Sequence, residues 1–409
     1  MKRFSTHTLA LIWGALMIAV ISSTLTLLVA GRPGAFASGG MHWVTQEAYE
    51  RAQRYERLDD VRDTMMTQFY EPLNEDDLIL GAIRGMTGAA NDVYTFYYTP
   101  EEMQSYNESS EGLYHGIGVL ITMTQDGFIE VLRVYPGTPA EEAGVRAGDV
   151  ITAVDGVEIL GSDGKAYNEA VERIRGVDGT QVELTILRDG TVFTQIVSRA
   201  DVNVSYIDYT MLDGGIGYVS ITQFTGDAQK RFGEAIEYFR ANDAKGMIID
   251  VRNNPGGLLD QVVAIADSIL PKGIIVYIQD RAGARNDYYS DEAYYDVPLA
   301  VLTNGNSASA SEILAASVQA FGRGTVVGLT TFGKGIVQTL LSFGEDGAGM
   351  QLTTASYYDG SGRSIHGTGV TPDIEVALEL DSVPLDPDPI SDNQLSAAIA
   401  ALFGDKGED

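Results

Sequence analysis

Strand-like and helix-like runs alternate over residues 201–384. The apolar runs "IGYVSI", "GMIIDVRN" and "PLAVLTN" are separated by "AQKRFGEAIEYFRAN" and "LLDQVVAIADSIL", whose apolar residues recur at helical spacing. This alternation predicts an α/β layer with a largely parallel sheet. Ligands in such sheets bind where strands end and helices begin, and Ser309 lies at a place of that kind.

The rest of the chain predicts further parts around this layer. Residues 41–108 show helical spacing, and residues 109–200 show short β-like runs with glycine and aspartate turns and one helix-like segment. A chain of 409 residues is too long for one ordinary core, so we expect a multi-domain α/β protein. The tail, residues 385–409, predicts a short amphipathic helix that forms either an oligomer contact or a contact with its own domain.

The N-terminus predicts a membrane anchor. Lys2 and Arg3 precede an uncharged apolar run from Leu9 to Gly31, which at ~1.5 Å per residue is long enough for a ~30 Å hydrocarbon core. The early cations favour a cytoplasmic N-terminus, so we expect a single-pass anchor within residues 1–38 and a body outside the cytoplasm at the cell membrane. The A-x-A pattern at residues 35–37 leaves a cleaved signal peptide as the alternative.

Charge and cysteine content exclude several classes of function. There are 27 Lys and Arg against 57 Asp and Glu, a formal charge of −30 that repels phosphate backbones, so no nucleic-acid partner is expected. Cysteine is absent, which excludes disulfides, thiol nucleophiles and cysteine zinc sites. No H-E-x-x-H and no G-x-S-x-G pattern is present, so a zincin and an α/β-hydrolase lose support. We expect neither a metal nor a cofactor.

A serine activated by a lysine is the chemistry that these exclusions favour. Ser309 lies in "SASASE", and Lys334 follows in "TFGKGIVQ". A lysine can take the proton of a serine only if its pKa of ~10.4 falls, which burial achieves by destabilising the ammonium. Phe332, Ile336 and Val337 are expected to surround Lys334. Gln338, four residues on, is placed to orient the amine without adding a charge.

Backbone N–H groups near Ser309 predict an oxyanion hole. Gly256 and Gly257, in "DVRNNPGG", end an apolar strand in a turn that a substrate carbonyl can approach, and the N–H of Ala310 is a further donor. Simpler interpretations stay open from spacing alone. Ser309 and Glu312 fit a capping box, Lys334 fits a solvated lysine, and Pro-Gly-Gly fits an ordinary turn.

Three longer stretches resemble one known family. They are "TNGNSASASEILAASVQAFGRGTVVGLTTFGKGIVQ", "IIDVRNNPGGLLDQ" and "GTGVTPDIEV", and together they are similar to the carboxy-terminal processing, or tail-specific, proteases. The resemblance implies a crotonase/ClpP-like Ser/Lys peptidase core at 201–384, with Ser309 as nucleophile, Lys334 as base and Gln338 as its partner. The departures at Asn91, Asp92, Tyr94 and Thr95 are expected not to affect the chemistry.

The same resemblance implies a PDZ domain at 109–200. In "YHGIGV" the loop Gly116, Ile117, Gly118 and Val119 offers backbone N–H groups to a terminal carboxylate, while the adjacent strand pairs with the peptide. Arg175 matches a position that couples the PDZ domain to the protease in some members, and a surface arginine is the alternative.

The expected function is therefore an anchored serine endopeptidase that binds protein or peptide substrates by accessible C-termini, as a homodimer or higher homo-oligomer. A noncatalytic peptide-binding scaffold of the same fold and an acyl-CoA enzyme of the crotonase type are the competing classes. Regulated cleavage in signal transduction and envelope quality control are both compatible with the sequence.

Overall fold

The computed structural model describes residues 45–110, 113–124, 127–159, 165–203, 205–380, 383–384 and 386–403. Within these ranges no helix combines the length and apolar character needed to cross a membrane. The predicted anchor at residues 1–38 lies outside them. Contacts divide the chain into Met1–Gly85 and Met86–Asp409, which are described separately.

The N-terminal unit is helical, as its spacing predicts. Helix α2 covers Gln46–Gln68, and α3, which covers Glu75–Gly88, begins in this unit. Acidic residues Glu75, Asp76 and Asp77 occupy the first turn of α3, where the helix dipole favours negative charge. Apolar side chains of α2 remain exposed, among them Leu58 and Val61.

The second unit opens with a short strand and a helix, followed by a mostly β domain. Strand β1 is Phe96–Tyr98 and helix α4 is Pro100–Ser110. The β domain contains β2 (Leu113–Gly116), β3 (Val119–Met123), β4 (Ile129–Val134), α5 (Pro139–Glu142), β5 (Val150–Val154), β6 (Val157–Glu158), α6 (Lys165–Ile174), β7 (Gln181–Arg188), β8 (Thr191–Ser198) and β9 (Ala200–Asn203). Its main sheet has the order β3-β4-β5-β7-β8, with β3 at an edge, and β2 pairs with β9 outside it. The alternating residues Val182, Leu184 and Ile186 of β7 face the hydrophobic core of this β domain, which is separate from that of the α/β layer.

The α/β layer follows at residues 207–403. Its elements are β10 (Ile207–Leu212), β11 (Ile216–Ile221), α7 (Ala228–Ala241), β12 (Gly246–Asp250), α8 (Leu259–Asp267), β13 (Gly273–Asp280), β14 (Arg285–Ser290), β15 (Leu299–Thr303), α9 (Ala310–Ala320), β16 (Thr325–Gly328), β17 (Ile336–Phe343), β18 (Ala348–Asp359), β19 (Ile374–Glu375) and α10 (Asn393–Phe403). The sheet order is β10-β11-β12-β15-β16-β19, and every pair except β10 with β11 is parallel. The predicted α/β layer is confirmed.

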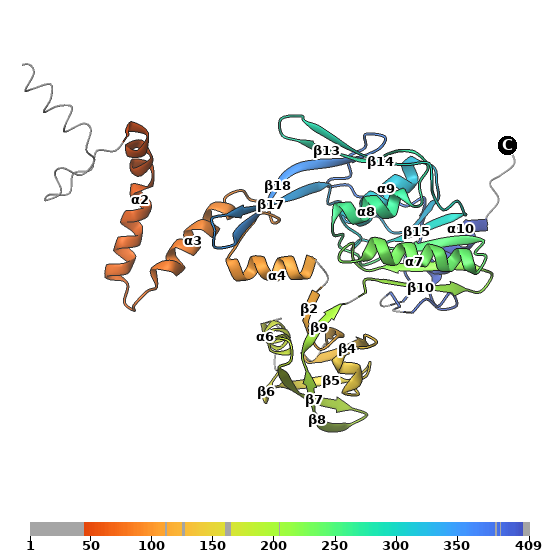
Figure 1. Cartoon of the computed structure of the whole chain (residues 1–409), viewed down its shortest axis with the longest axis horizontal. Coiled ribbons are helices and arrows are strands. Elements are labelled where there is room, and N and C mark those ends of the chain that lie inside the picture. The colour runs from red at the N-terminus through yellow and green to blue at the C-terminus, as the bar shows by residue number, and fades with distance from the viewer. Residues whose placement is uncertain are drawn as a thin grey trace, which may run out of the picture. The chain divides into compact units, whose positions relative to one another are not determined.

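Both faces of this sheet are covered by helices, so its central strands are apolar throughout. Met247 and Ile249 of β12 face the cluster formed with α7, α8 and α9, while Ile248 between them faces α10. Figure 1 shows α7, α8, α9 and α10 around this core. The C-terminal helix therefore packs on its own domain through Leu395 and Ala398.

A second, antiparallel sheet carries the segment after Lys334. Its order is β1-β18-β13-β14, and β17 also pairs with β18 (Figure 1). Strand β1 joins this sheet with Phe96 opposite Gln351, so the chain before α4 is held against β18.

Candidate active site

Ser309 lies at a strained turn between β15 and α9. It is half-buried, and its φ of 56° and ψ of −113° place a residue other than glycine in the left-handed half of backbone space. Such a conformation persists only where neighbouring contacts hold it, and it is frequent at functional sites. A sharp strand-to-helix turn of this kind exposes a nucleophile above the sheet edge.

The two flanking serines hold this turn against the strand end at residues 250–257. The Ser307 hydroxyl donates to the Val251 carbonyl at 2.8 Å, and the Ser311 hydroxyl donates to the Asn254 carbonyl at 2.9 Å. Both serines are fully buried. Ser307 and Ser311 therefore fix the loop that carries Ser309.

The turn that contains Gly256 and Gly257 lies directly against Ser309. A Cβ atom added to Gly256, whose φ is 110°, would lie 2.8 Å from Ser309 Cβ, so only glycine fits there. The N–H of Gly256 donates to Asn254 Oδ1 at 2.8 Å, which corrects the expectation that this N–H is free for substrate. In the described part of the chain the N–H groups of Gly257 and Ala310 have no hydrogen-bond acceptor. These two N–H groups therefore remain available to a ligand, and their role in an oxyanion hole stays a prediction.

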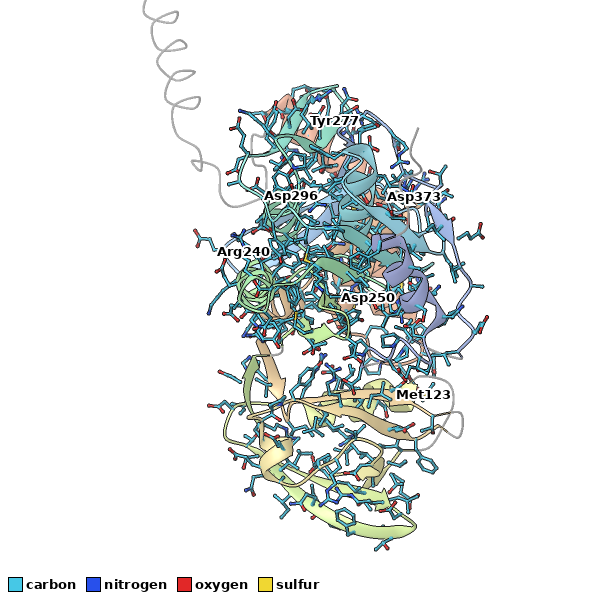
Figure 2. All side chains as sticks on the ribbon, turned by 90° about the vertical axis from the view of Figure 1, so that its right-hand side faces the viewer. Met123, Arg240, Asp250, Tyr277, Asp296 and Asp373 are labelled. Atoms are coloured by element: carbon cyan, nitrogen blue, oxygen red, sulfur yellow. The ribbon has the colours of Figure 1, made fainter. Side chains whose placement is uncertain are left out.

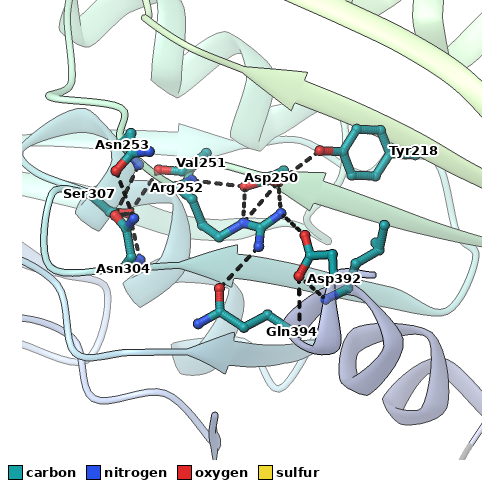
Figure 3. Close-up of polar contacts among 10 residues, drawn as sticks. Tyr218, Asp250, Val251, Arg252, Asn253, Asn304, Ser307, Asp392 and Gln394 are labelled. Carbon is teal, nitrogen blue, oxygen red and sulfur yellow. Dashed lines mark hydrogen bonds and ion pairs between the residues drawn. The ribbon is translucent and has the colours of Figure 1, made fainter. Parts of the chain in front are cut away.

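A buried ion-pair network lies at Asp250 and Arg252, just before the turn of Gly256 and Gly257. Arg252 Nη2 lies 2.6 Å from Asp250 Oδ2 and 2.8 Å from Asp392 Oδ2, and all three side chains are almost fully buried. Figure 3 shows this guanidinium between the two carboxylates, with Gln394 accepting a further hydrogen bond. Burial acts to lower the pKa of Arg252, but the two carboxylates outweigh it and hold the pKa above its ordinary value. Asp250, at the end of β12, is also labelled in Figure 2.

Glu312 joins the Ser309 turn to the Lys334 loop. Its Oε2 atom accepts the N–H of Ser309 and the N–H of Lys334, each at 2.8 Å. Its Oε1 atom accepts the N–H of Gly333 at 2.7 Å and the hydroxyl of Thr331 at 2.5 Å. The predicted capping box is present, and the same fully buried carboxylate holds the loop of the predicted base. Capping and catalysis are therefore compatible.

Tyr357 joins the same two segments from β18. Its hydroxyl lies 3.0 Å from the Ser309 carbonyl oxygen and within hydrogen-bond distance of the Lys334 carbonyl oxygen. The side chain is 2 % exposed, and burial, followed by the charge of Glu312, raises its pKa well above the ordinary value. The hydroxyl therefore stays protonated and remains a donor between the two segments.

The Lys334 side chain is half-buried. Of the three residues expected to surround it, Phe332 is 59 % exposed. The ring of Tyr94 lies against the amine, with Nζ 4.2 Å from the ring centroid. Burial lowers the pKa of Lys334, and the charges of Asp92 and Glu312 oppose this shift. The lowered pKa is the direction that a lysine base requires.

Gln338 lies in β17 beyond a bulge that separates it from Val337. The bulge interrupts the regular alternation that was expected to place Gln338 and Lys334 on one face. The Gln338 amide donates to Thr353 Oγ1 at 3.2 Å, and no hydrogen bond joins it to the Lys334 amine in the described residues. Gln338 is therefore hydrogen-bonded to β18, and its predicted role as partner of Lys334 stays a prediction.

The loop of the β domain forms a groove beside its edge strand. Gly116, Ile117, Gly118 and Val119 line a cavity of about 270 Å³ together with Arg175. Gly118 has a φ of 83°, and a Cβ there would lie 2.3 Å from Thr138 Cβ, so the loop requires glycine. Arg175 lies 3.5 Å from Glu172 and is half exposed. It lies at the groove, and its predicted coupling role remains a prediction.

Sequence reasoning missed five residues of this site. Glu312 was recognised only as a capping residue. Tyr357 was missed because its contacts are with segments far away in the chain. Asn254 was missed although its hydrogen bond to the Gly256 N–H spans only two residues. The sequence analysis gave no role to Asp92 and Tyr94, which the structure brings to Lys334 through the ring of Tyr94 and the charge of Asp92. The described residues contain no group of three His, Asp or Glu side chains placed to bind a metal.

Comparisons with known proteins agree with these features. The model of peptidase family S41 matches residues 215–376, and a PDZ domain model matches residues 130–188. A carboxy-terminal-processing protease of Bartonella bacilliformis is 38% identical over 347 residues, covering 82% of this chain and 77% of the relative. The carboxy-terminal processing protease CtpA of Bacillus subtilis is 31% identical over 373 residues, covering 90% and 78%. The solved structure of the photosystem II D1 C-terminal processing protease is 29% identical with a TM-score of 0.50, covering 82% of this chain and 94% of that one.

The fold and the matched domains first define a class, that of serine peptidases in which a PDZ domain accompanies an α/β core. Within that class the relatives are specific. The chain belongs to the carboxy-terminal processing proteases of peptidase family S41. It is thus a serine-type peptidase whose PDZ domain indicates binding of peptide C-termini.

Proposed function

We propose that this protein is a membrane-anchored, extracytoplasmic endopeptidase in which Ser309 is the nucleophile and Lys334 the base. The observation that carries the proposal is the shared support of these two residues. Glu312 Oε2 accepts both of their N–H groups, and the Tyr357 hydroxyl lies at both of their carbonyl oxygens. The strained backbone of Ser309 and the lowered pKa of Lys334 add to it.

The reaction proceeds through an acyl-enzyme. Ser309 Oγ attacks the scissile carbonyl while its proton passes to the neutral amine of Lys334. The N–H groups of Gly257 and Ala310 stabilise the resulting oxyanion. When the tetrahedral intermediate collapses, the ammonium of Lys334 returns the proton to the leaving amine. Water then attacks the acyl-enzyme with the lysine again as base, and Ser309 is regenerated.

Substrate tails bind through the groove of the PDZ domain. Strand β3 forms the edge of its sheet and can accept a peptide as an added strand, with the terminal carboxylate at the loop of Ile117, Gly118 and Val119. The groove is mainly apolar, which suits tails ending in an apolar residue.

The proposal of cleavage is tested with the full chain in detergent and an unstructured substrate protein. Ser309→Ala and Lys334→Ala are expected to abolish cleavage. Ser307→Ala and Ser311→Ala loosen the loop but keep the attacking hydroxyl, so they are expected to retain measurable cleavage. Equal loss at all three serines would refute Ser309 as the nucleophile. Substrate binding without cleavage by the parent would favour the alternative of a noncatalytic peptide-binding scaffold.

Anchoring and assembly have separate support. The apolar run from Leu9 to Gly31 supports a membrane anchor, and deletion of residues 9–31 is expected to release the protein from membranes.

Exposed apolar side chains on α2, including Tyr55, Leu58, Val61 and Met65, support a homodimer or higher homo-oligomer through the helical unit. Replacing Leu58 and Val61 by serine is then expected to lower the mass measured by light scattering.

A further inference from the structure

The segment Asp92–Thr95 is folded around the carboxylate of Asp92. Asp92 Oδ1 accepts the N–H of Tyr94 at 3.1 Å, and Oδ2 accepts the hydroxyl of Thr95 at 2.6 Å. An aspartate that bonds to the backbone two residues on makes a stable local turn. The turn fixes the direction in which the Tyr94 ring leaves the backbone.

The same segment is bound to β18, on the sheet that also contains Gln338. Gln351 Nε2 donates to the Tyr94 carbonyl at 3.0 Å, and the N–H of Thr353 donates to Thr95 Oγ1 at 3.3 Å. Thr353 Oγ1 in turn accepts the amide of Gln338 at 3.2 Å. Gln338 is therefore linked to the turn of Asp92 through Thr353.

The amine of Lys334 lies against this segment. Its Nζ atom is 4.2 Å from the centroid of the Tyr94 ring, a distance at which the ring face attracts a cation. Asp92 and Glu312 are the carboxylates whose charges act on this amine. Burial acts to raise the pKa of Asp92, but hydrogen bonds from Thr353, Thr95 and the Tyr94 N–H, with the charge of Lys334, bring it below its ordinary value. Asp92 is thus anionic at any pH at which the enzyme would work.

We propose that Tyr94 and Asp92 form a cation site for the ammonium form of Lys334, which makes them positioning residues of the base. The inference rests on the proposed function, because it concerns the lysine assigned there as base. An ammonium has no lone pair and cannot accept the proton of Ser309. The site therefore holds Lys334 in its inactive protonation state, and the balance between burial and this site sets the pH at which the amine becomes active.

The first test is the pH dependence of kcat/KM for the full chain in detergent. Because the neutral amine is the active form, the rate rises with pH through the pKa of Lys334. Asp92→Asn removes an anion that favours the ammonium, so the rising limb is expected to move to lower pH by about half a unit or more. Asp213→Asn, at an exposed aspartate of the turn between β10 and β11, is the matched control and keeps the limb in place.

A direct measurement separates this inference from the proposed function. In a Ser309→Ala background, the rate at which acetic anhydride modifies Lys334 is followed against pH by mass spectrometry. Asp92→Asn is expected to lower the apparent pKa of Lys334. Tyr94→Leu is expected to lower it too, because leucine keeps apolar cover over the amine but removes the ring face that attracts the ammonium. Tyr94→Phe, which keeps the ring, is expected to restore it. An unchanged apparent pKa in both Asp92→Asn and Tyr94→Leu would overturn the inference.

Failure of the proposed function and failure of this inference can be told apart. If the parent cleaves nothing, the proposed function fails while the labelling still reports on the cation site. A purely structural role of the segment predicts lower activity at every pH without a shift of the limb, and that result would also overturn the inference. Should Asp92→Asn fail to fold, Tyr94→Leu decides, because Tyr94 is only part-buried and its carbonyl contact with Gln351 is kept.

Discussion

Glu312 and Lys334 are 22 residues apart in the sequence, yet Glu312 Oε2 accepts the backbone N–H of Lys334 at 2.8 Å. The carboxylate starts helix α9 and also fixes the loop before β17. Such a fully buried carboxylate with several charge-assisted hydrogen bonds is costly to disturb.

Glu312→Gln is expected to lower both stability and turnover. An amide has one acceptor oxygen, so at least one of the N–H groups of Ser309, Gly333 and Lys334 loses its partner, at about 1–3 kcal/mol. Thermal unfolding and steady-state kinetics measure the two effects. kcat should fall more than tenfold with little change in KM, since the peptide groove is untouched. Glu237→Gln, at an exposed residue of α7, is the control, and an equal effect there would contradict the prediction.

Asp392→Asn is expected to destabilise the core strongly. It weakens a buried pair with Arg252, and removing one partner of such a pair costs about 3–5 kcal/mol. Urea unfolding measures this loss. The exposed pair Lys272–Glu292 gives the comparison, because Glu292→Gln should cost less than about 1 kcal/mol. Similar losses for both variants would show that burial of Arg252 is unimportant.

Gly118→Val is expected to abolish tail binding. Valine cannot easily adopt a φ of 83°, and its Cβ would meet Thr138. Binding of a fluorescent peptide with a free C-terminus should weaken at least about tenfold, as should binding of an amidated peptide to the parent. Val192→Thr, at an exposed position of β8, should bind like the parent. Tight binding by Gly118→Val would place the carboxylate elsewhere.

His115 is expected to make stability depend on pH. Asp201, hydrogen-bonded to Nδ1 at 2.5 Å, and then Glu108 raise its pKa. A raised pKa stabilises the fold fully below the unfolded value of about 6.5, and this contribution is lost as pH rises through the higher folded value. Melting temperatures of the parent and of His115→Gln should therefore differ more at pH 5 than at pH 9. A constant difference would mean that the imidazole is not paired.

Local patterns in the sequence predicted much of this architecture. The alternation over residues 201–384 predicted a largely parallel sheet, because the periodicity of residues close together in the chain is visible without a structure. The PDZ domain and the processing-protease core were implied by the resemblance of longer stretches to a known family. The positive φ at Gly256 and Gly118 favours glycine locally, whereas the close approach of Ser309 and Thr138 to these two residues depends on the tertiary structure.

Only the tertiary structure decided what surrounds the predicted residues. The helix of the tail packs on its own sheet, and the amine of Lys334 lies against the ring of Tyr94. Both outcomes depend on contacts between segments far apart in the chain. The Gly256 N–H is taken by Asn254, only two residues away, and here the side-chain orientation decided the outcome. Spacing fixes which residue types are near in sequence, whereas packing of β1 and β17 on β18 determines which side chain reaches the amine.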